Sequence, residues 1–210
     1  DQNINAIAIA SPAKTHKDLA VQAIKNDKDV FIEKPFCLSL PDAQKLSELA
    51  TDKNKVLMVG HLLNYHNAFV KMKELIKNGK IGILQNIRAN RLALGAIRTE
   101  ESVIYDLSAH DISMTLSIVN ELPIGVNVQS IHHHHNIGPD AVSIKLSFSR
   151  GVTALINSDW MCPYKEHLFS VIGTKGSLIF DDTKNWSDKL LYNPSSVSYT
   201  HLTLPTMDSV

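Results

Sequence analysis

The first sixty residues alternate short apolar runs with amphipathic segments, and this alternation restricts the possible folds more than any other feature of the chain. The apolar runs are Ala6–Ala10, Val30–Ile32 and Val56–Val59. Between them, apolar residues recur at helical spacing from Thr15 to about Asn26, and again around Pro41, a residue favoured in a first helical turn. Strands that alternate with helices form β-α-β units, so we predict a parallel sheet here.

Polar residues mark where these two helices begin. Thr15, followed three residues later by Asp18, resembles a capping box, and Ser39 with Asp42 precedes the second helical segment. The run Ala6–Ala10 consists only of alanine and isoleucine. We therefore expect it to be a buried strand in the middle of a sheet.

After Gly60-His61 the pattern changes to two further helices and a series of strands. The helices are expected from about Tyr65 to Asn78, with Gly79 at the C-cap, and from about Leu107 to Val119. The expected strands are Ile83–Leu94, Ile124–His132, Ala141–Phe148, Val152–Trp160, His167–Ile172 and Ser177–Phe180. Consecutive strands without helices between them pair antiparallel, so we predict an antiparallel sheet here and a fold class of α/β plus α+β.

Composition excludes several classes of partner. Lysine and arginine total 21, as do aspartate and glutamate, so the net charge is zero and we expect no nucleic acid partner. No apolar stretch approaches the roughly 18 residues of a membrane span, so we expect no membrane association. Cys37 and Cys162 are far apart and lack a CxxC partner, which favours a reducing, cytoplasmic location and argues against disulfides or a cysteine zinc site.

Both ends of the sequence suggest a piece of a longer protein. The first residues lead directly into a strand, without Met, signal peptide or transit peptide, so we expect a fragment. Residues 195–206 follow a finished strand without a recognisable pattern. We therefore expect residues 194–210 to be a non-native or disordered tail.

Unusual polar residues follow each of the three predicted parallel strands. They are Ser11, Pro12 and His16 after the first, Glu33, Lys34 and Pro35 after the second, and Gly60 and His61 after the third. A turn with incidental polar residues explains any one of these groups, but ligands of open parallel sheets bind beyond the carboxyl ends of the strands. A cis Lys34–Pro35 bond, which X-Pro bonds allow, would aim the Lys34 ammonium into the crevice beside Glu33.

A second polar cluster lies in Asp106-Leu107-Ser108-Ala109-His110-Asp111. Residues four apart share a helix face, so Asp106 and His110 point the same way, whereas Asp111 is rotated toward another surface. A carboxylate and an imidazole on one face can share the hydroxyls of a substrate, and imidazole, which titrates near neutrality, can accept an alcohol proton. The alternative is that Asp106 is only an N-cap and His110 a hydrogen-bonded core residue.

Three other features have mainly structural explanations. The run His132–His135 suggests metal binding, but neighbouring strand residues point to opposite faces, so four imidazoles cannot reach one ion and we predict no metal site. Trp160 is expected to pack against the sheet rather than to form a substrate platform. Asn90, Arg91 and Arg98 are expected to recognise phosphate or to lie on a solvated surface.

In their order and spacing these motifs resemble the glucose-fructose oxidoreductase/inositol dehydrogenase (Gfo/Idh/MocA) family, from about residue 5 to 182. The resemblance rests on residues 7–12 with His16, 30–35, 59–61, Asp106 with His110-Asp111, and 173–176. It implies a Rossmann-type parallel sheet, of which residues 1–62 are the remnant of a dinucleotide-binding domain. It also implies that residues 63–193 bind substrate and contain an open, mostly antiparallel sheet, through which they form a homo-oligomer, a dimer or tetramer.

The resemblance implies an NAD(P)-dependent oxidoreductase that transfers hydride from a secondary alcohol of a sugar, polyol or nucleotide-linked sugar to NAD or NADP. In this reading Lys34 contacts the substrate hydroxyl and the nicotinamide region, Asp106 binds substrate, and His110 is the acid/base. The residues implied to line the cofactor side are Ser11, Pro12, His16, Glu33, Pro35 and His61. The alternatives are a non-catalytic oligomerisation module and a hydratase or hydrolase on the same scaffold.

The sequence departs from the family pattern in two places. It contains no GxGxxG phosphate loop, so we expect that roughly 60 to 70 residues precede residue 1 and that the isolated chain binds cofactor weakly and is inactive. The arginine and proline that follow Gly-His in the family are Asn64 and Asn67 here, which puts local contacts to cofactor or substrate in question.

Overall fold

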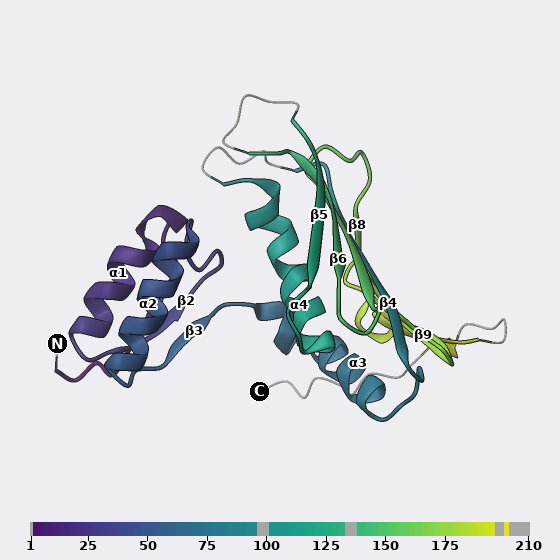
Figure 1. Ribbon diagram of the computed structural model, residues 1–210, viewed down its shortest axis with the longest axis horizontal. Helices are drawn as coiled ribbons and strands as arrows, with labels where there is room; N and C mark the ends of the chain where they lie inside the picture. The colour runs from purple at the N-terminus through teal and green to yellow at the C-terminus, as the bar shows by residue number, and fades with distance from the viewer. Residues whose placement is uncertain (1, 96–100, 133–137, 196–199, 202–210) are drawn as a thin grey trace. The chain divides into compact units, whose positions relative to one another are not determined.

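The computed structural model of the chain describes residues 2–95, 101–132, 138–195 and 200–201 (Figure 1). It divides into two compact units, residues 1–62 and residues 63–210, and each unit has its own hydrophobic core. No helix in the described ranges is long and apolar enough to cross a membrane.

The first unit is a three-stranded parallel sheet, in the order β1-β2-β3, with two helices. Its elements are β1 (Ala6–Ile9), α1 (Ala13–Lys25), β2 (Asp29–Ile32), α2 (Leu40–Asp52) and β3 (Leu57–Val59). Ile9 pairs with Ile32, and Ile32 pairs with Val59, so the three strands end side by side. The predicted β-α-β parallel sheet is confirmed.

Both helices of this unit pack on the same face of the sheet. Ile9, Val30 and Ile32 share one core with residues of α1 and α2, among them Ile24 and Leu46. The expectation that the first strand is buried like the middle of a sheet is wrong, because Ala6–Ala8 are exposed. β1 is an edge strand of the described sheet, so neighbours cover it on one side only.

The two predicted helix starts have different outcomes. Ser39 caps α2 as expected, since its hydroxyl accepts a hydrogen bond from the Asp42 backbone N–H at 3.3 Å. The capping box at Thr15 is wrong: α1 begins at Ala13 after Pro12 and has no side-chain cap. The Thr15 hydroxyl instead donates back to the Pro12 carbonyl at 2.8 Å, because it already lies inside the first helical turn.

The second unit packs helices on one face of an eight-stranded mixed sheet. Its helical elements are a 3₁₀ turn η1 (Leu62–Tyr65), α3 (Asn67–Lys77), a π-helical turn η2 (Ile104–Ser108), α4 (Ala109–Val119) and a 3₁₀ turn η3 (Trp186–Asp188). Its strands are β4 (Leu84–Leu92), β5 (Gly125–Ile131), β6 (Ala141–Ser147), β7 (Thr153–Asp159), β8 (Glu166–Gly173), β9 (Gly176–Asp181), β10 (Leu190–Pro194) and β11 (Thr200–His201).

The order of this sheet is β11-β10-β9-β8-β4-β7-β6-β5. All its pairs are antiparallel except β4 with β7, which run parallel, so the mostly antiparallel prediction is confirmed. The exception matters for the site, because the carboxyl ends of β4 and β7 meet at one edge. Buried residues from both strands, Ile87 and Ile156, share the core with Phe69 of α3 and Met114 of α4.

Residues after 182 contain structure that the sequence pattern did not predict. Leu190–Pro194 pairs with β9, and Thr200–His201 pairs with β10. Leu190 is fully buried in the core of the unit. β10 was missed because five residues that include Asn193 and Pro194 carry too little alternation to predict a strand.

Candidate functional site

Three backbone turns meet at the carboxyl edge of the parallel sheet in the first unit. The Glu33 backbone N–H donates to the Ile9 carbonyl at 2.9 Å, and the Gly60 N–H donates to the Ile32 carbonyl at 2.7 Å. These bonds continue the sheet just past its strands, so the residues that follow β1, β2 and β3 are neighbours. The Lys34–Pro35 peptide bond is cis, as expected.

His16 links two of these turns. Its Nδ1 lies 2.8 Å from the Pro35 carbonyl oxygen, and its Nε2 lies 2.8 Å from the Ser11 carbonyl oxygen. The side chain is 1% exposed. The imidazole therefore joins the turns that carry Ser11 and Lys34, and that His16 lies on the cofactor side stays a prediction.

Glu33, Gly60 and His61 pack closely at the ends of β2 and β3. A Cβ at Gly60 would lie 3.0 Å from the Phe31 ring and 3.1 Å from the Glu33 carboxyl carbon, so a larger residue would displace Glu33. Glu33 Oε2 also accepts a hydrogen bond from the Lys34 backbone N–H at 3.3 Å. Burial lowers the pKa of His61, and the Glu33 carboxylate opposes this shift. His61 Nδ1 is buried and has no hydrogen-bond partner among the described residues.

The second unit carries Asp106 and His110 on the continuous helical segment formed by η2 and α4. Asp106 lies in the π-helical turn and is 9% exposed. The turn is wider than an α-helix, a distortion frequent at functional sites. The alternative that Asp106 is an N-cap is wrong, because α4 follows η2 without a side-chain cap. His110 is half-buried, and its carbonyl accepts a hydrogen bond from the Ser113 hydroxyl at 2.8 Å.

Asn64, one of the two departures from the family pattern, contacts the same helix. Its Nδ2 donates to the Ser113 hydroxyl at 3.3 Å, which ties η1 to α4. Asn67, the other departure, is the first residue of α3, where His66 Nδ1 accepts the Ala68 backbone N–H. Both asparagines therefore have positions in the fold of the second unit.

Arg91 has a structural partner that the sequence did not reveal. Its Nε and Nη2 donate to the two carboxylate oxygens of Asp111, each at 3.0 Å, and both side chains are buried. The expectation of phosphate recognition or a solvated position is wrong for Arg91, because its guanidinium neutralises a carboxylate inside the unit. Burial raises the pKa of the Asp111 carboxyl, and Arg91 opposes that rise. Arg98 lies outside the described residues.

Trp160 also contacts the candidate site. Its indole Nε1 donates to Asp106 Oδ2 at 3.0 Å, and the side chain is 3% exposed. The expectation that Trp160 packs on the sheet is therefore incomplete. Sequence reasoning had one usable signal for this contact, since a buried indole N–H needs an acceptor.

The candidate residues thus form one cluster in each unit. The first unit brings together Ser11, Pro12, His16, Glu33, Lys34, Pro35 and His61 at the carboxyl edge of its sheet. The second unit holds Asp106 and His110 at the carboxyl ends of β4 and β7. That the two clusters share one substrate stays a prediction.

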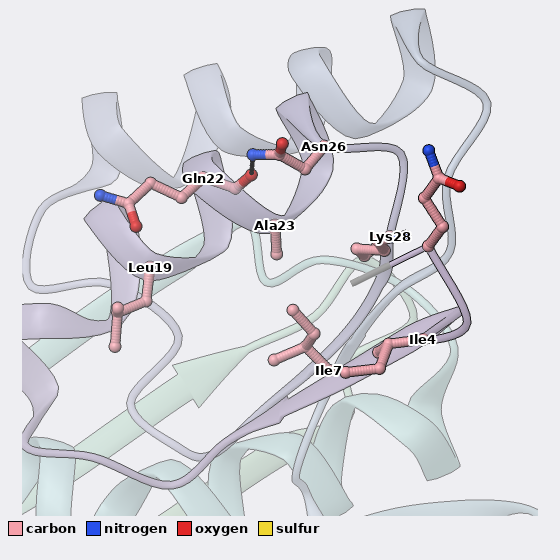
Figure 2. A pocket seen from close by; sticks show the side chains of 8 residues that line it. Ile4, Ile7, Leu19, Gln22, Ala23, Asn26 and Lys28 are labelled. Atoms are coloured by element: carbon pink, nitrogen blue, oxygen red, sulfur yellow. Dashed lines mark hydrogen bonds between the residues drawn. The ribbon is translucent and has the colours of Figure 1, made fainter.

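Two other features lie apart from these clusters. In the first unit, a hollow of about 440 Å³ lies beside β1 and α1 (Figure 2), at the opposite end of the strands from Lys34. It is lined by Gln2, Ile4, Ile7, Leu19, Gln22, Ala23, Asn26 and Lys28. Among the described residues no three His, Cys, Asp or Glu side chains gather to hold a metal ion. Of the histidine run, His132 follows β5, and residues 133–135 lie outside the described ranges.

Fold and residues together define a class: a parallel α/β unit with polar residues at the carboxyl ends of its strands, followed by an α/β unit with a large mixed sheet. Residues 1–61 match the family model "Oxidoreductase family, NAD-binding Rossmann fold" of GFO/IDH/MocA proteins, and residues 69–179 match the GFO/IDH/MocA C-terminal domain. The chain belongs to the GFO/IDH/MocA family, as the sequence motifs indicated.

Individual relatives support the same assignment. The chain is 27% identical over 195 residues to myo-inositol 2-dehydrogenase of Thermotoga maritima, covering 88% of this chain and 58% of the relative. It is 25% identical over 193 residues to 2,7-anhydro-N-acetylneuraminate hydratase of Escherichia coli, covering 85% and 52%. An inositol dehydrogenase homologue of Azotobacter vinelandii, solved with NADH and myo-inositol, has the same fold, with a TM-score of 0.86 at 20% identity over 95% of this chain and 56% of that one. The chain thus spans little more than half the length of these proteins.

Proposed function

We propose that the protein is an NAD(P)-dependent dehydrogenase that oxidises a secondary alcohol of a sugar, polyol or nucleotide-linked sugar. The observation that carries this proposal is the Asp106–His110 pair, a carboxylate and an imidazole one turn apart on a helical segment anchored to two parallel strands. Membership of a family of NAD-binding oxidoreductases and the likeness to an inositol dehydrogenase support it.

Each residue has a distinct role in this chemistry. The His110 imidazole accepts the proton of the reacting hydroxyl. The Lys34 ammonium stabilises the negative charge that develops on that oxygen. The Asp106 carboxylate accepts a hydrogen bond from a neighbouring substrate hydroxyl and thereby fixes which carbon reacts.

The residues at the carboxyl edge of the parallel sheet fit a dinucleotide. His61 Nδ1 is buried without a hydrogen-bond partner among the described residues, and Ser11 and Lys34 add a hydroxyl and a cation at the same edge. We propose that Ser11, Pro12, Glu33, Pro35 and His61 hold the nicotinamide half of NAD or NADP, with His16 behind them. When bound, the nicotinamide supplies the hydride acceptor.

A hydratase is the second candidate, because a relative of similar identity is named as one. Both activities use a group that moves a proton to or from substrate oxygen, so the residues alone do not separate them. The two reactions differ in their net consumption of NAD. Oxidation of an alcohol reduces one NAD per turnover, whereas hydration adds water and leaves no net change in NAD.

The test measures NADH formation by the product of the complete gene that contains this sequence. Free polyols, including myo-inositol, and nucleotide-linked sugars are offered with NAD and NADP, and absorbance of reduced cofactor is followed beside product mass. We expect reduced cofactor and oxidised product in equal amounts for at least one member of the panel. Product heavier than its substrate by one water, without reduced cofactor, would favour the hydratase instead.

We further propose a cytoplasmic homo-oligomer, a dimer or tetramer, that assembles through the open face of the large sheet; the free thiols of Cys37 and Cys162 favour that location. This face carries a hydrogen-bonded polar row across four strands. In it Ser143 donates to Asn157 at 2.8 Å, Asn157 to Asn90 at 2.9 Å, and Asn90 to Glu166 at 2.7 Å.

Light scattering tests the oligomer. We expect a mass that is a multiple of 23.3 kDa for the chain, because the polar row and the exposed Leu155 beside it offer a self-complementary surface. Leu155→Glu should shift the mass toward that of one chain, whereas Val70→Glu, on the exposed side of α3, should not. A wild-type mass of 23.3 kDa at micromolar concentration would contradict the proposal.

A further inference from the structure

The hydrogen bond from Trp160 to Asp106 selects one charge state and one orientation of the carboxyl group. An indole N–H only donates, and it reaches Asp106 Oδ2 at 3.0 Å in a buried setting. The ionised carboxylate is the better acceptor, because a hydrogen bond to a charged group is shorter and stronger than a neutral one. The contact therefore stabilises the ionised form and fixes the side-chain rotamer of Asp106.

Two neighbouring contacts show that Trp160 belongs to a larger anchoring arrangement. The Ser108 hydroxyl donates to the Ser158 hydroxyl at 2.9 Å, and Arg91 holds Asp111. Arg91 and Ser158 are paired residues of the parallel strands β4 and β7. Trp160 follows Ser158 by two residues and is buried like it. The segment that carries the acid and the imidazole is thus fixed at three points along the ends of two strands.

Packing alone does not require a tryptophan at this position. Other large aromatic side chains of the same core, Phe69, Phe169 and Phe180, fill their space without a polar atom. A buried indole brings an N–H that must be satisfied, and a backbone carbonyl is as able to accept it as a side chain is. Here the indole N–H donates instead to Asp106, the residue of the π-helical turn that binds substrate in the proposed function.

We propose that Trp160 is a positioning residue for the reaction: its indole N–H holds the Asp106 carboxylate ionised and oriented to accept a hydrogen bond from the substrate. This inference rests on the proposed function, in which Asp106 binds substrate. Trp160, which follows β7, thus contributes to substrate recognition indirectly. It acts through Asp106 and does not contact the reacting atoms.

The first experiment is independent of activity. The chain contains two tryptophans, Trp160 and Trp186, so its indole N–H region in a ¹H–¹⁵N correlation spectrum has two signals, which Trp160→Phe and Trp186→Phe assign. We expect the Trp160 signal to move with pH as Asp106 ionises. In Asp106→Asn the signal should remain but stop titrating, because an amide oxygen still accepts and carries no charge. A Trp160 signal that moves equally in wild type and Asp106→Asn would overturn the proposal.

The second experiment measures kinetics in the complete gene product with the best substrate of the panel. Trp160→Phe keeps most of the ring volume and removes the donor. We expect KM for the alcohol to rise roughly ten- to hundredfold, about the effect of losing one hydrogen bond to a charged group. The acid limb of the pH profile of KM should also move upward, because Asp106 without its donor is protonated at a higher pH. The KM for NAD and the activity of the control Trp186→Phe should stay within about twofold, a change small beside one lost hydrogen bond.

These two measurements separate the inference from the proposed function. If no member of the panel is oxidised, the proposed function fails while the spectrum still reports whether Trp160 senses the Asp106 charge. If oxidation occurs and Trp160→Phe leaves both KM and the acid limb unchanged, the positioning role is refuted and the dehydrogenase stands. Should Trp160→Phe fail to fold, the titration in Trp186→Phe, which retains Trp160, decides the question.

Discussion

Replacing Arg91 with methionine is expected to lower the free energy of unfolding of residues 63–210 by about 3–5 kcal/mol. The two donors of Arg91 meet both oxygens of Asp111 at 3.0 Å, and Asp111 is 1% exposed. Methionine fills most of the space but leaves the carboxylate buried without a counter-charge. The desolvation of that charge is then uncompensated, which costs far more than the loss of a surface ion pair.

The size of this effect should depend on pH. Burial raises the pKa of Asp111 above its ordinary 3.8, and both causes that oppose the rise come from Arg91. Without Arg91 the pKa in the folded state therefore increases further. A carboxyl whose pKa is higher in the folded than in the unfolded state destabilises the fold as pH rises. The penalty of Arg91→Met should thus be smallest at pH values below the folded-state pKa of Asp111 in the wild type, and should grow as pH rises from there toward the higher pKa of the variant.

Urea unfolding followed by tryptophan fluorescence measures this effect, because both tryptophans lie in the second unit. Arg91→Met should lower the unfolding midpoint strongly, and adding Asp111→Leu should restore most of it by removing the orphaned charge. Arg150→Met is the matched control, since Arg150 is exposed in the turn between β6 and β7 of the same unit, and we expect a change within about 0.5 kcal/mol. Equal midpoints for Arg91→Met and Arg150→Met would contradict the structural role.

The elements predictable from the sequence were those set by local pattern. The three parallel strands follow from short apolar runs, α2 from the Ser39 cap, and the end of α3 from Gly79, which follows the C-cap with a φ of 74°. In each case the information lies within a few residues. The prediction of a capping box at Thr15 was wrong because local pattern does not rank two competing helix starts. The helix begins earlier, directly after Pro12.

The contacts that build the second cluster could not be predicted in this way. Arg91 and Asp111 are 20 residues apart, Ser108 and Ser158 are 50 apart, and Asp106 and Trp160 are 54 apart. They meet because β4 and β7 pair in parallel, and periodicity within a strand does not say which strand becomes its neighbour. A buried charge with a long-range partner therefore looks like a surface charge in the sequence.

We expect large losses of kcat/KM when Lys34 or His110 is replaced. Lys34→Met should lower kcat/KM of the complete gene product for its alcohol substrate by roughly 10²- to 10³-fold, the size of losing one preorganised electrostatic stabiliser. His110→Asn should lower it by roughly 10²- to 10⁴-fold, as expected for a general base. If the two groups act on the same oxygen, the double variant should be little worse than His110→Asn alone.

The control variants make the same two substitutions, Lys to Met and His to Asn, at exposed positions. Lys45→Met changes a lysine on the exposed side of α2 in the same unit as Lys34, and His132→Asn changes an exposed histidine beyond β5. Both should retain wild-type kcat/KM. The pH profile of kcat adds a separate signature, because its acid limb, produced by protonation of an imidazole, should flatten in His110→Asn and persist in Lys34→Met.

Each result maps onto one part of the proposal. Loss of activity in Lys34→Met and His110→Asn, with non-additive effects, requires the residue after β2 and the helix after η2 to serve one substrate, although they belong to different units. Fully additive losses would place them on separate steps, such as cofactor binding and proton transfer. If Lys34→Met is as active as Lys45→Met, the proposed role of Lys34 in stabilising the reacting oxygen is refuted.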